Sequence, residues 1–113
     1  MSDMNKLPGL DHIAYLEKAL DVARRALANG KHPFGAILVG PEGEVLMEQE
    51  NAFDQEGRVG HAETVLSRRA CQAYDADFLA ACSMYVSAEP CAMCAGSAYW
   101  AGIGRVVYAM SEK

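Results

Sequence analysis

A histidine and two cysteines set the strongest constraint on how this chain can fold. His61 opens the segment HAETV, and Cys91 and Cys94 lie in EPCAMC, some thirty positions further along. Pro90 can occupy the first position of a helix, and cysteines three residues apart in that helix direct both sulfurs to one side. The three side chains can meet if the helices that begin near His61 and Pro90 pack side by side, with both N-termini at the same end.

The chemistry of these side chains indicates zinc. Zinc prefers thiolate sulfur and imidazole nitrogen, and unpaired N–H groups at a helix N-terminus favour thiolates. The N-terminal segment lacks the basic-then-apolar pattern of a signal peptide, and no apolar run has the length of a bilayer span. We therefore expect a cytoplasmic location, where the close spacing of Cys91 and Cys94 favours thiolates over disulfides.

The number of protein ligands separates a structural zinc from a catalytic one. A structural site is usually closed by four protein groups, whereas a catalytic site has three and an open position for water. The other candidate ligands are more simply interpreted as core or surface residues: Cys71, Cys82, His12 and His32. The sequence therefore predicts His61, Cys91 and Cys94 as zinc ligands, with water in the fourth position.

Two glutamates lie beside these ligands and have different expected roles. Glu63 follows His61 by two residues, and in the first turn of a helix its carboxylate can lean over the metal-bound water without binding the metal. Zinc lowers the pKa of such a water to about 7, and a nearby carboxylate can move its proton to a leaving group. The alternative for Glu63 is a simple interaction with the helix dipole. Glu89 is expected only to support the ligand loop by hydrogen bonding.

The remaining pattern predicts alternating helices and strands. Apolar residues recur at helical spacing over 10–29, and PFGAILVG and EVLMEQEN flank a PEG turn as in a β-hairpin. A polar loop over 51–60 is followed by a helix over 61–74, a strand over 82–88, a helix over 90–101 and a strand over 105–110. The order α-β-β-α-β-α-β predicts an α/β fold with a mixed sheet and helices on both faces.

Length and charge limit the number of domains and the classes of partner that this chain is expected to have. The chain has 113 residues without repeats or a composition boundary, so we expect residues 1–113 to form a single domain. The formal net charge of −5 gives no support for a basic surface that binds a phosphate backbone. Small basic pairs at 24–25 and 68–69 are typical of solvated helix faces. The charge therefore favours a small-molecule substrate, and no membrane partner is expected.

The segments HAE and PCAMC together resemble the zinc-dependent cytidine and nucleobase deaminase superfamily, whose signature is H-x-E…P-C-x-x-C. The resemblance covers most of the chain and implies a three-layer α/β/α cytidine deaminase-like fold. It implies that zinc on His61, Cys91 and Cys94 activates water to attack an amine-bearing ring carbon. It also implies that Glu63 carries the proton to a ring nitrogen and then to departing ammonia, and that backbone N–H groups near Ala62 and Cys91 position the attacking oxygen.

Flanking segments are similar to two groups within that superfamily. PFGAILV and AYWAGIGRVVYA resemble guanine deaminase-like proteins, whereas CAG and IGRVV are also similar to tRNA adenosine deaminases. By this resemblance Asn51 hydrogen-bonds the substrate. Phe34 and Trp100 are candidates for stacking on the base, with ordinary core packing as the alternative for each.

Three functions follow as hypotheses. The first is a hydrolase of non-peptide C–N bonds that releases ammonia from a free nucleobase, either guanine or a related amino-purine or amino-pyrimidine. The second is a tRNA-specific adenosine deaminase, and the third is an inactive scaffold stapled by zinc. The acidic balance favours the first. Because the chain stops soon after its last expected strand, where members of these groups continue, we expect an exposed sheet edge and a homodimer that covers it.

Overall fold

The computed structural model describes residues 11–109 of the chain. Its elements, in chain order, are α1 His12–Ala28, β1 Gly35–Val39, β2 Val45–Glu50, α2 Phe53–Glu56, the 3-10 helix η2 Gly57–Val59, α3 Ala62–Ala73, α4 Ala76–Ala80, β3 Ser83–Val86, α5 Ala92–Ala101 and β4 Arg105–Tyr108. Every predicted helix and strand is present, with ends that differ by a few residues. The predicted start of the first helix at Leu10 and the predicted end of the last strand at Met110 lie outside the described residues.

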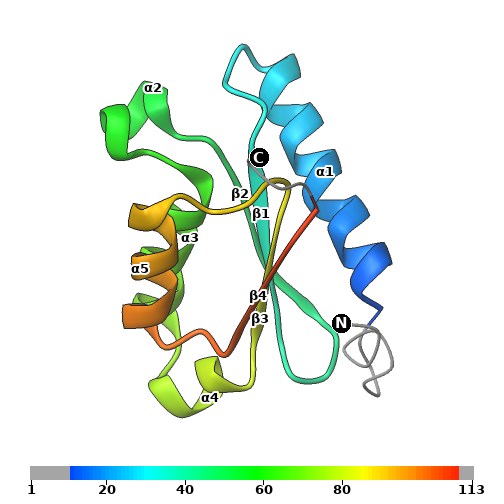
Figure 1. Cartoon of the computed structure of the whole chain (residues 1–113), viewed down its shortest axis with the longest axis vertical. Coiled ribbons are helices and arrows are strands. Elements are labelled where there is room, and N and C mark those ends of the chain that lie inside the picture. Colours follow the sequence, from blue (N-terminus) through cyan, green and yellow to red (C-terminus); the bar gives the residue numbers. More distant parts are fainter. Residues whose placement is uncertain (1–10, 110–113) are drawn as a thin grey trace.

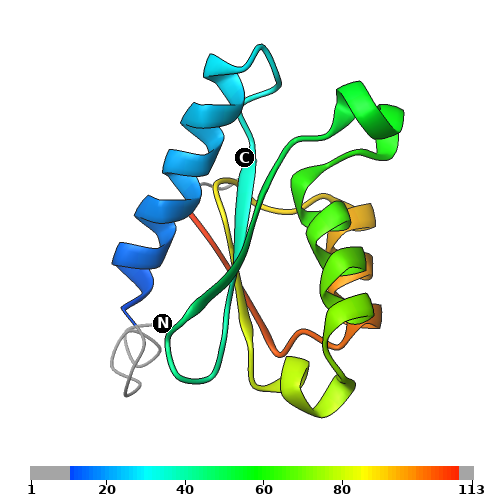
Figure 2. The ribbon, with the colours of Figure 1, turned by 180° about the vertical axis from the view of Figure 1, so that it is seen from behind.

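The four strands form one mixed sheet between layers of helices. Their order is β2-β1-β3-β4, and β1 is antiparallel to both β2 and β3, whereas β3 and β4 are parallel. Helix α1 covers one face of the sheet, and α3 and α5 cover the other (Figures 1 and 2). This is the three-layer α/β/α arrangement that the sequence predicts, and it leaves β2 and β4 at the edges.

Strand β1 lies at the centre of the hydrophobic core. All five of its residues are buried, because helices cover the sheet on both sides. Side chains alternate between the faces of a strand, so Ile37 and Val39 pack in the core beneath α1. Ala36 and Leu38 pack in the core beneath α3 and α5. The continuous apolar run GAILV is therefore a strand buried on both faces, and it anchors both helical layers.

Two short helical regions are absent from the sequence prediction. The segment over 51–60, predicted as a loop, contains α2 and η2, and α4 lies in the connection between α3 and β3. Helix α4 begins after Asp75, whose carboxylate accepts a hydrogen bond from the Phe78 backbone N–H at 2.9 Å, and it buries Leu79. Helices this short present one or no buried side chain and therefore have no apolar periodicity for sequence reasoning to detect.

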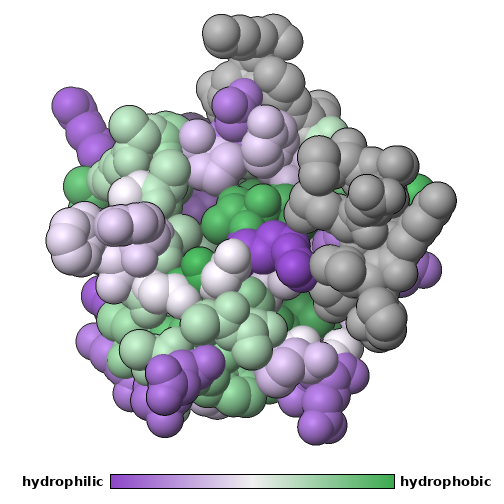
Figure 3. Space-filling view, turned by 60° about the horizontal axis from the view of Figure 1, so that its bottom comes forward, coloured by the Kyte–Doolittle hydropathy of each residue, from purple (hydrophilic) through white to green (hydrophobic). Residues whose placement is uncertain are grey.

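The surface near α4 and the β1–β2 turn mixes hydrophobic and hydrophilic residues (Figure 3). Within residues 11–109, no helix combines the length and the apolar character that crossing a membrane requires. The N-termini of α3 and α5 lie at the opposite end of the molecule (Figure 1). That end carries the predicted metal ligands.

Candidate metal centre and active site

The N-terminal ends of α3 and α5 bring the three predicted ligands together. His61 is the N-cap residue of α3, and Cys91 is the N-cap residue of α5. Both have extended backbone, and neither side chain makes a capping hydrogen bond to its own helix. Cys94 lies in the first turn of α5 and is buried. Because α3 and α5 pack against each other, the imidazole and the two sulfurs face one another.

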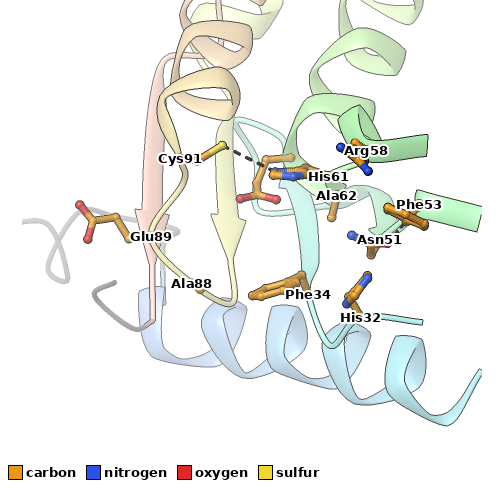
Figure 4. A pocket seen from close by; sticks show the side chains of 11 residues that line it. His32, Phe34, Asn51, Phe53, Arg58, His61, Ala62, Ala88, Glu89 and Cys91 are labelled. Atoms are coloured by element: carbon orange, nitrogen blue, oxygen red, sulfur yellow. Dashed lines mark hydrogen bonds between the residues drawn. The ribbon is translucent and has the colours of Figure 1, made fainter. Parts of the chain in front are cut away.

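The distances between these side chains fit a tetrahedral zinc ion. Nδ1 of His61 lies 3.6 Å from Cys91 Sγ and 3.5 Å from Cys94 Sγ, and all three ligand atoms lie within 4.8 Å of one another. With Zn–S near 2.3 Å and Zn–N near 2.05 Å, tetrahedral angles place nitrogen and sulfur about 3.6 Å apart. Figure 4 shows the short separation between His61 and Cys91. Donor type and spacing therefore both suit zinc.

Burial makes the charge state of Cys94 dependent on a bound cation. Burial raises the pKa of the Cys94 thiol to about 12, and the hydrogen bond from Thr64 acts in the opposite direction. The negative charges of Glu63 and Cys91 raise this pKa further. A cation between the three ligands stabilises the thiolate, so metal binding is expected to release a proton from this group.

Of the four residues weighed as further ligands, His32 lies in the wall of the neighbouring cavity but outside the group of three, and the others lie elsewhere in the described part of the chain. His12 is the first residue of α1 and is buried, with its Nδ1 2.6 Å from the Tyr85 hydroxyl. The sulfurs of Cys71 and Cys82 each donate to a backbone carbonyl within their own segments, at 3.3 Å. Among histidine, cysteine and acidic side chains within residues 11–109, His61, Cys91 and Cys94 form the group whose ligand atoms lie close enough together to hold a metal. The observed number of ligands therefore fits an open site.

A cavity of about 500 Å³ opens beside this metal centre. A volume of roughly 300–1,000 Å³ is typical of small-molecule sites. Six residues predicted as metal ligands, proton carrier or substrate contacts share its wall: Phe34, Asn51, His61, Ala62, Glu63 and Cys91. They come from the start of β1, the end of β2 and the N-termini of α3 and α5 (Figure 4).

The two glutamates of the sequence motifs occupy different parts of the wall. Glu63 is 9% exposed and belongs to the first turn of α3, the turn that His61 caps. Glu89 lies in the segment before α5, and its carboxylate points away from Asn51 and His61 in Figure 4. The predicted difference between their roles is consistent with this placement.

The backbone around Gly60 brings Asn51 to the metal centre. Ala52 N–H donates to the Gly60 carbonyl at 2.7 Å, and a Cβ on Gly60 would lie 2.5 Å from the Ala52 carbonyl oxygen. Only glycine allows this approach, which joins the end of β2 to the start of α3. The Asn51 side chain is fixed there, because its Oδ1 accepts from Phe53 N–H at 2.9 Å.

One predicted substrate contact does not reach the cavity. Trp100 is 85% exposed and stacks edge to face on Tyr99, with ring centroids 5.4 Å apart. It follows Cys94 by six residues, which corresponds to about 9 Å along a helix axis, so α5 carries it away from the metal centre. The structure therefore separates Trp100 from Phe34 and Asn51, and it does not support a contact between Trp100 and substrate.

The cavity wall also contains residues that sequence reasoning did not assign to it: His32, Phe53, Arg58 and Ala88. His32 and Phe53 pack edge to face, with ring centroids 5.6 Å apart. Phe53 follows Asn51 by two residues and is an aromatic side chain within a polar segment, which is the signal that could have identified it. Arg58 had no comparable signal, because a single arginine in a polar segment is usually solvent-exposed.

Comparison with known proteins identifies the family. The model of the cytidine and deoxycytidylate deaminase zinc-binding region matches residues 10–110. The chain belongs to this family. The resemblance stated from HAE and PCAMC is thereby confirmed, and so are zinc as the metal of the domain and hydrolytic C–N cleavage as the reaction of the family.

Individual deaminases similar to this chain act on different substrates. A probable cytosine deaminase of Schizosaccharomyces pombe is 36% identical over 89% of the chain and 61% of its own length. A tRNA-specific adenosine deaminase of Aquifex aeolicus is 33% identical over 88% of the chain and 66% of its own length. The solved structure of guanine deaminase from Bacillus subtilis superimposes with a TM-score of 0.81 at 35% identity, over 90% of the chain and 66% of that protein. The chain thus spans a little less than two thirds of these relatives.

Proposed function

We propose that this protein is a hydrolytic deaminase of a free nucleobase, either guanine or a related amino-purine or amino-pyrimidine. Water replaces the exocyclic amine of the base, so that a C–N bond breaks, a C–O bond forms and ammonia leaves. One observation carries the proposal: two of the three proposed ligands, His61 and Cys91, share the wall of one cavity of small-molecule size with the buried Glu63 and the fixed amide of Asn51.

The proposed roles of the charged residues follow from their positions. His61, Cys91 and Cys94 would hold zinc, which when bound would supply a Lewis acid and lower the pKa of a bound water to about 7. Glu63 is proposed as the general acid–base, since its carboxylate lies next to the ligand turn and inside the cavity. It takes a proton from the attacking water and delivers protons to a ring nitrogen and to the departing amine.

The uncharged wall residues are proposed to orient the base. The Oδ1 of Asn51 is already used by Phe53 N–H, so the amide presents its NH₂ group as a donor to substrate. A base that carries a carbonyl oxygen or an unprotonated ring nitrogen at that edge provides the matching acceptor. Phe34 offers an aromatic face for stacking, and the backbone at Ala62 lines the same space.

Replacing Asn51 with aspartate tests this orientation. Aspartate keeps an oxygen for Phe53 N–H but replaces the donor that faces the substrate with an acceptor. Loss of one such hydrogen bond costs about 1–3 kcal/mol, so kcat/KM for ammonia release should fall roughly 10- to 100-fold. Steady-state kinetics measure the effect, and thermal unfolding checks that the variant is folded. An unchanged kcat/KM would remove Asn51 from the proposed site.

A substrate screen tests the proposed function itself. Ammonia release from guanine, isocytosine, cytosine and adenine should identify at least one free base that the zinc-loaded protein converts. The competing candidate is a tRNA adenosine deaminase, favoured by the similarity to the Aquifex aeolicus enzyme. The formal net charge of −5 argues against it, because binding a phosphate backbone depends on cationic side chains. Inosine formation in a tRNA anticodon stem-loop, without conversion of any free base, would replace our proposal with that one.

Self-association is part of the proposal. Helix α5 contains no charged residue, and its side chains Tyr99 and Trp100 are 75% and 85% exposed. A helix that is apolar on all sides is usually buried, so we propose that this face contacts a second copy. Replacing Trp100 with serine should weaken the dimer at least about tenfold in sedimentation velocity, because aromatic anchors dominate interfaces. Leu27→Ser, at a 61% exposed position on α1, should leave the dimer intact. An undiminished dimer in the Trp100 variant would contradict this assignment.

A further inference from the structure

A hydroxyl group connects the two helices of the metal centre. Thr64 is the third residue of α3, and its Oγ1 donates a hydrogen bond to Cys94 Sγ on α5 at 3.2 Å. Threonine hydroxyls within helices commonly donate to a carbonyl three or four residues earlier in the same helix. The hydroxyl of Thr64 instead points across the helix interface to a sulfur thirty residues away in sequence.

The accepting sulfur is the most enclosed of the three proposed ligands. Cys94 is 1% exposed, so water has little access to it. Cys91, by contrast, is the N-cap residue of α5 and is exposed. A hydrogen bond from a fixed donor restricts the direction in which Cys94 Sγ points and places it 3.5 Å from His61 Nδ1. Groups that hydrogen-bond to a ligand in this way orient it and tune its affinity for metal.

We propose that Thr64 is a positioning residue for the metal centre, which holds the Cys94 sulfur in the orientation that zinc binding requires. This inference rests on the ligand set proposed above. It assigns to the motif HAET a function for each polar side chain: His61 binds metal, Glu63 moves protons, and Thr64 orients a cysteine on the neighbouring helix. Thr64 does not itself touch the metal or the substrate.

The test compares valine and serine at position 64. Thr64→Val keeps the branched shape but removes the hydroxyl, whereas Thr64→Ser keeps the hydroxyl and removes a methyl group. Zinc affinity is measured by competition with a chromophoric chelator. The cobalt(II)-substituted protein reports sulfur orientation through its thiolate-to-cobalt charge-transfer absorption. We expect Thr64→Val to weaken zinc binding about tenfold or more and to shift the absorption, and Thr64→Ser to restore both.

The same helix offers a matched control. The Ser67 side chain is buried one turn later, and its Oγ has no hydrogen-bond partner among residues 11–109. Ser67→Ala removes a buried hydroxyl from α3 without touching the metal centre, so its zinc affinity and cobalt spectrum should match the parent protein. Thr64→Ala provides a second variant without the hydroxyl if the valine variant fails to fold.

The outcomes separate this inference from the ligand proposal. If Thr64→Val retains the parent affinity and spectrum, the positioning role is overturned and the ligand set stands. Equal weakening by valine and serine also overturns it, because serine keeps the hydroxyl and the effect would then not follow the hydrogen bond. If the parent protein binds no zinc, or Cys94→Ala binds it as tightly as the parent, then the ligand set fails and the inference fails with it.

Discussion

Replacing Glu63 with glutamine is expected to abolish ammonia release while leaving zinc bound. The amide matches the carboxylate in shape but cannot accept and return a proton. General acid–base groups contribute about 10²- to 10⁴-fold to rate, and Glu63 is proposed to act in several successive proton transfers. We therefore expect kcat to fall at least about 1,000-fold. Steady-state kinetics together with metal analysis of the purified variant measure both parts of the prediction.

Glu89 supplies the matched control for this experiment. It is the other glutamate in the cavity wall, but its carboxylate points away from Asn51 and His61. Glu89→Gln should therefore change kcat by less than about tenfold, as expected for a residue without a proton-transfer role. A Glu63→Gln variant that retains zinc and converts the base at a rate near that of the parent protein would remove the proposed mechanism.

Zinc removal is expected to lower the stability of the fold substantially as well as to stop catalysis. The proposed ligands lie on α3 and α5, so a metal held by them would bind only the folded chain and would stabilise it by about 4 kcal/mol when free zinc exceeds its Kd a thousandfold. For a domain of this size such a change corresponds to a decrease in Tm of more than roughly 10 °C on chelation. Differential scanning fluorimetry with chelator, followed by added zinc, should show a reversible shift.

Two cysteine variants assign this shift to the metal centre. Cys94→Ala should have a low Tm that responds to neither chelator nor zinc, because one of three ligands is missing. Cys71→Ala should respond like the parent protein, since Cys71 lies on the exposed side of α3 and its sulfur bonds to the Arg68 carbonyl. A zinc-dependent shift that survives in Cys94→Ala would contradict the ligand assignment.

The layered fold could be predicted because its main elements have strong local signals. The buried run GAILV, the apolar stripe of α1 and the glycine break after α5 each follow from short-range pattern. The same reasoning missed α4, whose single buried residue, Leu79, produces no periodicity. Asp75 is an N-cap signal that sequence reasoning could have used.

The grouping of His61, Cys91 and Cys94 could be predicted from the sequence, whereas much of the cavity wall could not. His61, Cys91 and Cys94 combine distinctive chemistry with fixed spacing, and the helix starts near them specify which ends must meet. The position of Trp100 could not be predicted in this way, because the aromatic character of a side chain gives no information on which end of its helix lies at the cavity. Arg58 reaches the wall through the path of α2 and η2, which depends on backbone contacts such as that between Ala52 and Gly60.

The placement of His61 and Glu63 on one turn of α3 has a mechanical consequence. Any tilt or slide of that helix carries the ligand and the proposed proton carrier together, so their mutual spacing is insensitive to strain elsewhere in the molecule. The residues proposed to contact the base, Phe34 and Asn51, adjoin strands of the sheet instead, so they can move separately from that turn. Small shifts between sheet and helix can therefore change substrate preference while the spacing between His61 and Glu63 is kept.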